Sequence, residues 1–427
     1  MVGVIVALLV LNGVIIFHEF GHYMFARLFG VEVLEFAVGF GPKLLAIRNK
    51  NGTRFVLKLL LFGGSCSMKG EQGDDMSEGS FSATPVWQRA IIIAMGPAFN
   101  MFLALVAAAA ITFAFGVDYP VVKMVFPGSP AESAGLAAGD RLLTFNGNRI
   151  TTTREYLSDL AYYGVSDEIL ITYSRGGDVF SASFPSYVMN RYRLGFRYSN
   201  ETSGVVSVIS GGSAESAGLM AGDIVKAIDG TAIGDDCSLR EYVNTAEFDE
   251  TPVVMLCDRG GKDIEVVIQP SPEPVLSAGF ELDGVPQSVP FVEAIDGAYN
   301  EISYYLRAVY RALQTVLMRK SGVDDLSGPV GTVTAIGGVY SAAAKQGTPV
   351  ATKTVLMLVA LISASIGMTN LVPFPALDGF QLMFFGIEAV RGRPVSSKIR
   401  FAINSVGFSL IMLVMLYVSV RELFVFF

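Results

Sequence analysis

The chain has 427 residues, of which 52% are hydrophobic and only 16% charged, and its formal net charge is −8. This composition is too apolar for a soluble protein and too charged for a purely membrane-embedded one. We therefore expect a few membrane-spanning helices combined with soluble domains. The acidic balance does not indicate a nucleic-acid partner, and none is expected.

The first apolar run, residues 1–29, is expected to be a transmembrane helix and contains a His-Glu-x-x-His sequence at residues 18–22. Positions four apart share a helix face, so His18 and His22 can direct two imidazoles at one metal ion. Glu19 is placed to act as general base on a water activated by that metal. The alternative is a chance match inside a helix bundle, but such polar groups are costly in a spanning helix unless they function.

Three further apolar segments predict transmembrane helices at residues 88–116, 353–390 and 400–427. Basic residues are concentrated between the first two spans and between the last two. By the positive-inside rule, both connections face the cytoplasm. The more acidic residues 117–350 are then exported, and the histidine motif lies near the cytoplasmic end of the first span.

Residues 30–85 predict a β segment followed by a flexible acidic loop at 71–80. Glycine-rich turns at 39–42 and 61–64 bracket residues 54–59, which have the composition of a strand. The segment could dip into the bilayer beside the metal motif, or it could be a small cytoplasmic β-hairpin. Both interpretations remain open at this point.

The second span contains Gly96-Pro97 and, three residues later, Asn100. A Gly-Pro pair and an amide inside a span either kink the helix or let another helix approach closely. This structural interpretation of the segment is as good as a catalytic one.

The exported region contains an internal repeat, because Ala-Glu-Ser-Ala-Gly-Leu occurs at 131–136 and again at 214–219. Two domains follow, at residues 117–200 and 201–284. They resemble PDZ domains of the permuted bacterial kind, which accept an extended peptide at a sheet edge. Leu194-Gly195-Phe196 resembles a carboxylate-binding loop, but the later Gly279-Phe280 favours a closing strand in each copy.

Residues 285–320 predict an amphipathic helix associated with the membrane, because Ile302, Leu306, Val309 and Leu313 recur at helical spacing. A loop over residues 321–352 follows it, including a flexible Ser-Gly-Pro-Val-Gly segment at 327–331. The three cysteines have no zinc-ligand spacing. Cys237 and Cys257 share an exported domain and could form a disulfide, which the sequence does not decide.

A catalytic zinc usually has three protein ligands, and the chain has only two histidines, so a carboxylate must be the third. Glu32 and Glu35 are candidates, but their surroundings predict β structure. Asp378 is the stronger candidate, since it lies at a depth comparable with the two histidines. The prolines just before it break the spanning helix, as irregular active sites require. The alternative for Asp378 is a helix cap.

Together these motifs resemble the site-2 protease family, specifically the bacterial regulator-of-sigma-E type with two PDZ domains. The resemblance implies Zn²⁺ bound by His18, His22 and Asp378, with Glu19 as catalytic base. It also implies substrate contacts, for which the candidates are Asn370, Pro373, Pro375, Gly63, Gly64 and Asn100. Two departures concern the substrate surface: Phe380 replaces a second glycine after Asp-Gly, and Ser65-Cys66-Ser67 replaces an aromatic residue.

The predicted fold is a polytopic α-helical membrane protein with four transmembrane helices, a membrane-associated β segment, two tandem exported PDZ-like α+β domains and an amphipathic helix. The predicted activity is zinc-dependent hydrolysis of peptide bonds inside single-span membrane proteins, such as anti-sigma factors or remnant signal peptides. The expected location is the bacterial inner membrane, with substrate tails at the PDZ domains. The rivals are a catalytically inactive membrane-tethered PDZ scaffold and a metal transporter.

Overall fold

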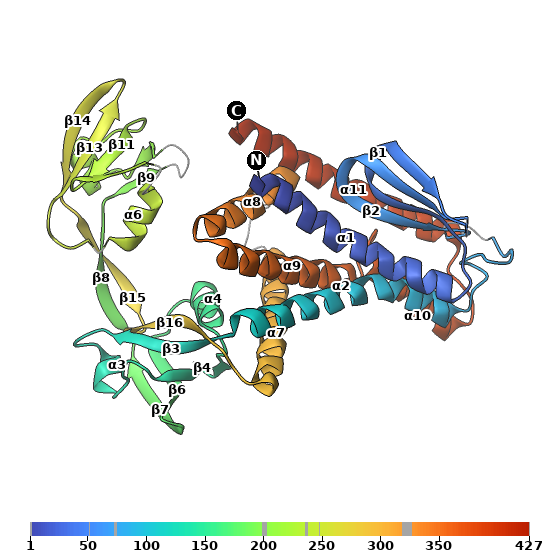
Figure 1. Ribbon diagram of the computed structural model, residues 1–427, viewed down its shortest axis with the longest axis horizontal. Coiled ribbons are helices and arrows are strands. Elements are labelled where there is room, and N and C mark those ends of the chain that lie inside the picture. The colour runs from blue at the N-terminus through green and yellow to red at the C-terminus, as the bar shows by residue number, and fades with distance from the viewer. Residues whose placement is uncertain are drawn as a thin grey trace. The chain divides into compact units, whose positions relative to one another are not determined.

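The computed structural model describes residues 2–50, 52–71, 75–198, 203–234, 238–246, 248–317 and 327–426 (Figure 1). Two compact units are present. One combines Met1–Tyr119 with Val285–Phe427, and the other is Pro120–Gly284. The first unit therefore joins the two ends of the chain, and the second is an insertion between them. Cys237, one partner of the possible disulfide, lies outside the described residues.

Helices dominate the first unit: α1 (Val2–Leu28), α2 (Val86–Phe115), α7 (Phe291–Leu317), α8 (Pro329–Lys345), α9 (Thr348–Asn370), α10 (Asp378–Arg391) and α11 (Ser397–Phe426). Four stretches have the length and apolar composition to cross a membrane: Val2–Leu28, Val86–Phe115, Thr348–Asn370 and Lys398–Glu422. In Figure 1, α1, α2 and α9 pack together. The described apolar side chains of α11 are mostly exposed.

Small residues bring α2 and α9 close together. Ala104 and Ala107 of α2 are buried with Ala360 and Ala364 of α9, and Tyr305 of α7 completes the cluster. Helices with alanine at their contact can approach closely, so van der Waals packing between these small residues stabilises the pair. The resulting close packing gives the polar groups on α2 a fixed position relative to α1.

The third predicted span, residues 353–390, consists of two helices, and the break that its prolines predict lies between them. Helix α9 ends at Asn370, and α10 begins at Asp378 after an irregular link. Pro373 and Pro375 exclude continuous helix there, and Ala376 adopts a positive φ of 75°. The break places Asp378 in the first turn of a new helix.

The predicted loop at 321–352 is wrong for its described residues, 327–352, because most of them form helix α8. Pro329 lies at the start of α8, where its missing N–H costs no hydrogen bond and its fixed φ suits a helix. Gly328 is the N-cap, and its N–H donates to Glu422 Oε1 of α11 at 2.6 Å. The Ser-Gly-Pro-Val-Gly segment therefore starts a helix.

The β segment of the first unit consists of β1 (Val33–Arg48) and β2 (Arg54–Met68), which pair with each other twice. Residues 35–38 pair with 64–67 and also with 54–57. Both strands turn at glycines with positive φ, including Gly39, Gly41 and Gly63. The strand prediction is confirmed, and the segment forms a folded sheet and not a single hairpin.

The second unit is built from two modules. The first contains β3 (Val117–Val125), α3 (Pro130–Ser133), β4 (Arg141–Phe145), β5 (Asn148–Arg149), α4 (Thr153–Tyr163), β6 (Glu168–Arg175) and β7 (Asp178–Pro185). The second contains β9 (Phe196–Tyr198), β10 (Val205–Val208), α5 (Ser213–Ser216), β11 (Ile224–Ile228), β12 (Thr231–Ala232), α6 (Leu239–Thr245), β13 (Val253–Arg259) and β14 (Lys262–Ile268). Each module surrounds its own buried apolar cluster.

The connections between the modules correct the predicted domain boundaries. Strands β8 (Tyr187–Arg193) and β15 (Ser271–Ser277) pair along their full length. The next strand, β16 (Phe280–Gln287), joins β3 in the sheet of the first module. Residues 280–284 therefore do not belong to the second module, and the second module is inserted into the first.

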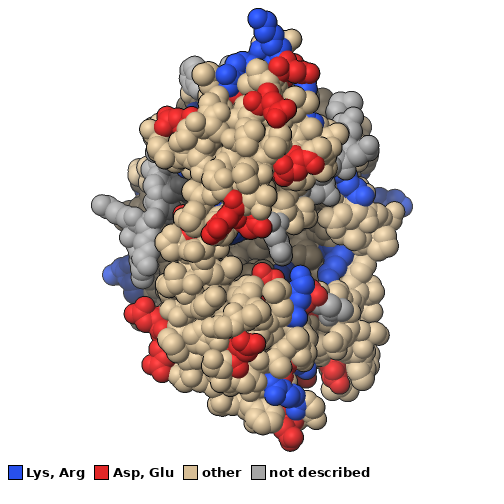
Figure 2. All heavy atoms as spheres, turned by 90° about the vertical axis from the view of Figure 1, so that its left-hand side faces the viewer, with Lys and Arg blue, Asp and Glu red and all other residues tan. Residues whose placement is uncertain are grey.

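The same arginine–aspartate contact occurs inside each of the two modules. Arg175 donates to both carboxylate oxygens of Asp140, at 2.6 Å each, and Arg259 donates to both oxygens of Asp223, at 2.7 Å each. Both aspartates are 1% exposed. Bidentate pairing of this kind is strong and directional, so each pair fixes a loop against its sheet. Other charged side chains are dispersed among uncharged surface in the view of Figure 2.

A candidate metal centre at the start of α10

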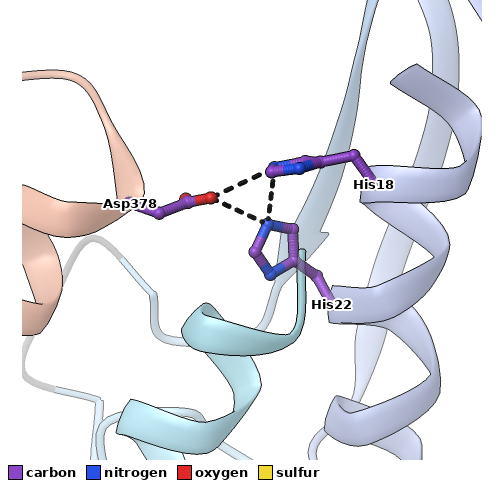
Figure 3. Close-up of side chains that lie close together, drawn as sticks. All are labelled: His18, His22 and Asp378. Atoms are coloured by element: carbon purple, nitrogen blue, oxygen red, sulfur yellow. Dashed lines mark hydrogen bonds and ion pairs between the residues drawn. The ribbon is translucent and has the colours of Figure 1, made fainter. Parts of the chain in front are cut away.

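Three side chains from distant parts of the chain meet in the first unit (Figure 3). His18 and His22 lie one turn apart on α1, and Asp378 is the first residue of α10. The histidines are 7% and 6% exposed. The Nε2 atoms of the two histidines are 3.2 Å apart, and Asp378 Oδ2 lies 3.1 Å from His18 Nε2 and 3.4 Å from His22 Nε2.

These distances fit a bound zinc ion. Two ligands at about 2.0–2.1 Å from a tetrahedral Zn²⁺ lie roughly 3.4 Å apart, close to the spacing of all three pairs. Asp378 Oδ2 is a buried oxygen with no hydrogen-bond partner among the described residues. Two imidazole nitrogens and a carboxylate oxygen are also a ligand set that zinc accepts. The three groups leave a fourth tetrahedral position open.

Helix α2 leaves the space that the metal position needs. A Cβ atom on Gly96 would lie 2.3 Å from His22 Nε2 and 2.8 Å from His18 Nε2. Any other residue would therefore fill the position between the two imidazoles. From sequence, the Gly96-Pro97 pair predicted either a kink or a close approach of another helix. The structure has the close approach, between α2 at Gly96 and the histidines of α1.

His22 is oriented through its second nitrogen. Its Nδ1 lies 2.9 Å from the carbonyl oxygen of Ile92 on α2. Because a carbonyl only accepts, Nδ1 carries a proton, and in a neutral imidazole Nε2 is then the unprotonated nitrogen, which faces His18 and Asp378. A backbone carbonyl has no signature in a sequence, so this contact could not be predicted.

Glu19 lies at the edge of the β sheet. Its side chain lies against the backbone of Gly64 in β2. Gly64 permits this approach, because a Cβ there would lie 3.0 Å from Glu19 Cγ. The sheet edge therefore fixes the carboxylate beside the histidines.

A cavity of about 430 Å³ opens at this cluster. Its lining includes Glu19, the three side chains of the metal cluster, the sheet edge from Gly63 to Met68, and Asn370, Glu71 and Gln381. Polar groups thus line a cavity between helices that are long and apolar enough to cross a membrane. Such a cavity can admit water and an extended peptide next to a metal ion.

The comparisons with known proteins match nearly all of the chain. The model of peptidase family M50 covers residues 6–414. The chain belongs to peptidase family M50. It is therefore a membrane metallopeptidase of the site-2 type, whose cofactor is zinc. The family resemblance drawn from the sequence motifs is confirmed.

Individual relatives of this M50 peptidase match at low identity over long stretches. A protein of Thermotoga maritima named "Putative zinc metalloprotease" is 28% identical, over 97% of this chain and 98% of the relative. A protein of the same name in Vibrio cholerae is 28% identical over 92% of both chains. One in Brucella suis is 26% identical over 99% of this chain and 96% of the relative.

The M50 peptidase brings some predicted residues to the cavity and leaves others outside it. Asn370, Gly63 and Gly64 line the cavity. Pro373 and Pro375 are not among its lining residues, and a Cβ on Gly407 of α11 would lie 2.1 Å from Pro375. These prolines therefore shape the link between α9 and α10.

Two alternatives were considered from sequence: Glu32 or Glu35 as the third metal ligand, and a helix-capping role for Asp378. Neither matches the structure. Glu35 pairs with Lys43 at 2.7 Å and Glu32 with Lys69 at 3.3 Å, so neither reaches the metal cluster. Asp378 follows the N-cap residue Leu377 and directs its Oδ2 toward the histidines. Asn100 was a candidate substrate contact; it is 0% exposed and is not among the residues that line the cavity, and its role stays a prediction.

Proposed function

We propose that this peptidase hydrolyses a peptide bond within the membrane-spanning segment of its substrates, with His18, His22 and Asp378 as the zinc ligands. The observation that carries the proposal is the near-tetrahedral spacing of three ligand atoms at a cavity lined by Glu19. Zinc, when bound, acts as a Lewis acid that polarises the scissile carbonyl and acidifies water. The remaining steps fall to side chains and backbone of the chain itself.

Glu19 is the proton carrier in this proposal. Its carboxylate takes a proton from the attacking water and passes it to the nitrogen of the leaving amine. Its side chain lies against Gly64 at the sheet edge and lines the cavity. Asp378 and the histidines would hold the metal, which leaves Glu19 for proton transfer.

The sheet edge is the proposed substrate platform. A transmembrane helix hides its carbonyl groups in hydrogen bonds, so the substrate must unwind before attack. Residues 64–67 pair with residues 35–38 along one edge, and residues 64–67 also line the cavity. An unwound substrate adding as a strand there satisfies its freed backbone groups. Asn370, also at the cavity, is the nearest candidate for a side-chain contact to that backbone.

The outer part of the sheet supports contact with lipid. Leu44, Leu45, Ile47, Leu59 and Leu60 of this sheet are each at least half exposed. Large apolar side chains exposed on a soluble hairpin would promote aggregation, whereas a bilayer covers them at no cost. Of the two interpretations of this segment, we therefore favour the one in which it dips into the membrane.

The second unit is proposed to be a pair of exported PDZ-like modules. Glycines with a φ of 82° precede β9 in the second module and β16 in the first. A Cβ on Gly195 would approach Ala214 N, and one on Gly279 would approach Ala131 Cβ, so both loops face equivalent positions. The closing strands offer an edge at which a substrate tail can add. The rival function is a membrane-tethered scaffold of such modules without catalysis.

The decisive experiment co-expresses the peptidase with single-span membrane proteins and follows their cleavage. Wild type is expected to cleave a substrate within its span, and zinc-loaded Glu19→Gln is expected to leave it intact. Zinc content is measured on both proteins, since Gln keeps the size of the side chain but cannot accept the proton. Cleavage by zinc-loaded Glu19→Gln contradicts the mechanism, and zinc-loaded wild type without any cleavage favours the scaffold.

A further inference from the structure

Asn100 of α2 is a buried amide beside the metal cluster and takes no part in the proposed proton transfer. It is fully buried, and its Oδ1 has no hydrogen-bond partner among the described residues. The amide nitrogen, Nδ2, lies 3.3 Å from His18 Nδ1. A buried amide costs free energy unless it is bonded, so its place against a histidine of the metal cluster calls for a physical reason.

The protonation of His18 supplies that reason. Its Nε2 faces His22 Nε2 and Asp378 Oδ2. A histidine binds a metal through an unprotonated nitrogen, so the proton of a neutral His18 must sit on Nδ1. Nδ1–H and the Asn100 amide nitrogen would then be two donors facing each other. Turning the amide by 180° exchanges its nitrogen and oxygen and turns this clash into a hydrogen bond.

We propose that Asn100 is a positioning residue of the zinc site, whose Oδ1 accepts the Nδ1–H of His18 and holds Nε2 unprotonated toward the metal. The inference rests on the proposed ligand set. It assigns to Asn100 an effect on the metal that is separate from substrate binding. An outer partner of this kind fixes the ring and raises the basicity of the ligand nitrogen.

The spacing along α2 supports the proposal independently. The carbonyl that holds His22 belongs to Ile92, the gap for the metal is at Gly96, and the amide that meets His18 is on Asn100. Steps of four residues keep these three positions on one face of a helix. One face of α2 therefore orients both imidazoles and leaves room between them.

The test compares two substitutions of Asn100 in the full-length protein in detergent. Asn100→Asp keeps the shape and can only accept a hydrogen bond, whereas Asn100→Leu has similar bulk and cannot bond. Zinc affinity is measured by competition with a chelator, and the visible spectrum of the Co²⁺-substituted protein reports ligand geometry. Ser363→Ala, which removes another fully buried unbonded polar group on α9, is the control for a change in packing.

We expect Asn100→Leu to bind zinc about 10–100-fold more weakly, with an altered Co²⁺ spectrum, as for the loss of other outer partners. Asn100→Asp and Ser363→Ala should bind close to the wild-type level. Zinc binding by Asn100→Asp that is as weak as in Asn100→Leu overturns the proposal, because the amide then acts as a donor. Wild-type affinity and spectrum in Asn100→Leu also overturn it.

His22→Ala separates this inference from the proposed function. If His22→Ala loses zinc while Asn100→Leu does not, only the role of Asn100 is wrong. If neither variant changes zinc binding, the ligand set itself is wrong. Cleavage assays are not needed for either conclusion, since both readouts concern the metal.

Discussion

Gly96 and His22 lie so close that a single methyl group on Gly96 would come within 2.3 Å of His22 Nε2. Gly96→Ala is therefore expected to displace the imidazole and weaken zinc binding by at least ~10-fold, as for disturbed outer contacts of metal sites. The measurement is zinc content after dialysis against a weak chelator. Gly386→Ala on α10 is the matched control, because nothing lies within 4 Å of its added Cβ. Full zinc retention in Gly96→Ala would show that the imidazoles do not need this gap.

Asp378→Asn is expected to lower zinc affinity by more than the ~10–100-fold typical of outer partners, because it removes a negatively charged ligand. Glu35→Gln, which changes the other carboxylate considered from sequence, should leave zinc binding unchanged, since Glu35 is paired with Lys43. Equilibrium competition with a chelator measures both. The opposite ranking of the two variants would place the third ligand on the β segment.

Glu422→Ala is expected to destabilise the protein by about 1–3 kcal/mol, the cost of leaving a buried donor unbonded. The carboxylate is 7% exposed and accepts the N–H of Gly328, and a Cβ on Gly331 would lie 2.2 Å from its Oε1. Thermal unfolding in detergent measures the effect. Glu422→Gln keeps an acceptor oxygen and should cost less, so equal losses in the two variants would argue against this hydrogen bond.

Protonation of Asp223 at acid pH is expected to lower the folding stability of the second module. Arg259 holds the pKa of this carboxyl below its ordinary value, by a bidentate hydrogen bond. The stability it contributes is complete above the pKa of an unfolded aspartate, roughly 3.9, and is lost as the pH falls through the lower folded value. Hydrogen exchange of residues 220–228 in the full chain between pH 5 and 3 measures this loss. Asp223→Asn should remove most of the pH dependence there, and an unchanged profile would contradict the assignment.

The metal cluster was predictable from sequence because each part has a strong local signal. Two histidines four apart fix a shared helix face, and the prolines near Asp378 mark a broken helix whatever the tertiary packing. The parts that were missed depend on contacts without such a signal. The gap at Gly96, the carbonyl of Ile92 and the burial of Asn100 exist only because α1 and α2 pack at one particular register.

The errors in the fold have similar physical origins. Helix α8 contains three glycines, three valines and two threonines, which are weak helix formers, and a loop was predicted there. The closing strands were ambiguous because Gly195 and Gly279 are 84 residues apart, nearly the period of the repeat. That spacing fits a closing strand that belongs to the copy just before it. It fits equally well the observed arrangement, in which β9 belongs to the second module and β16 returns to the first.

The return of β16 to β3 sets an order on biosynthesis. A chain that emerges from its N-terminus can complete the second module from contiguous residues, but the first module must wait for a strand that follows it. Until then β3 has an unpaired edge, which is a site for non-native association in any folding intermediate. During biosynthesis, the inserted module should therefore mature first, and the module earlier in the sequence should be the last to close.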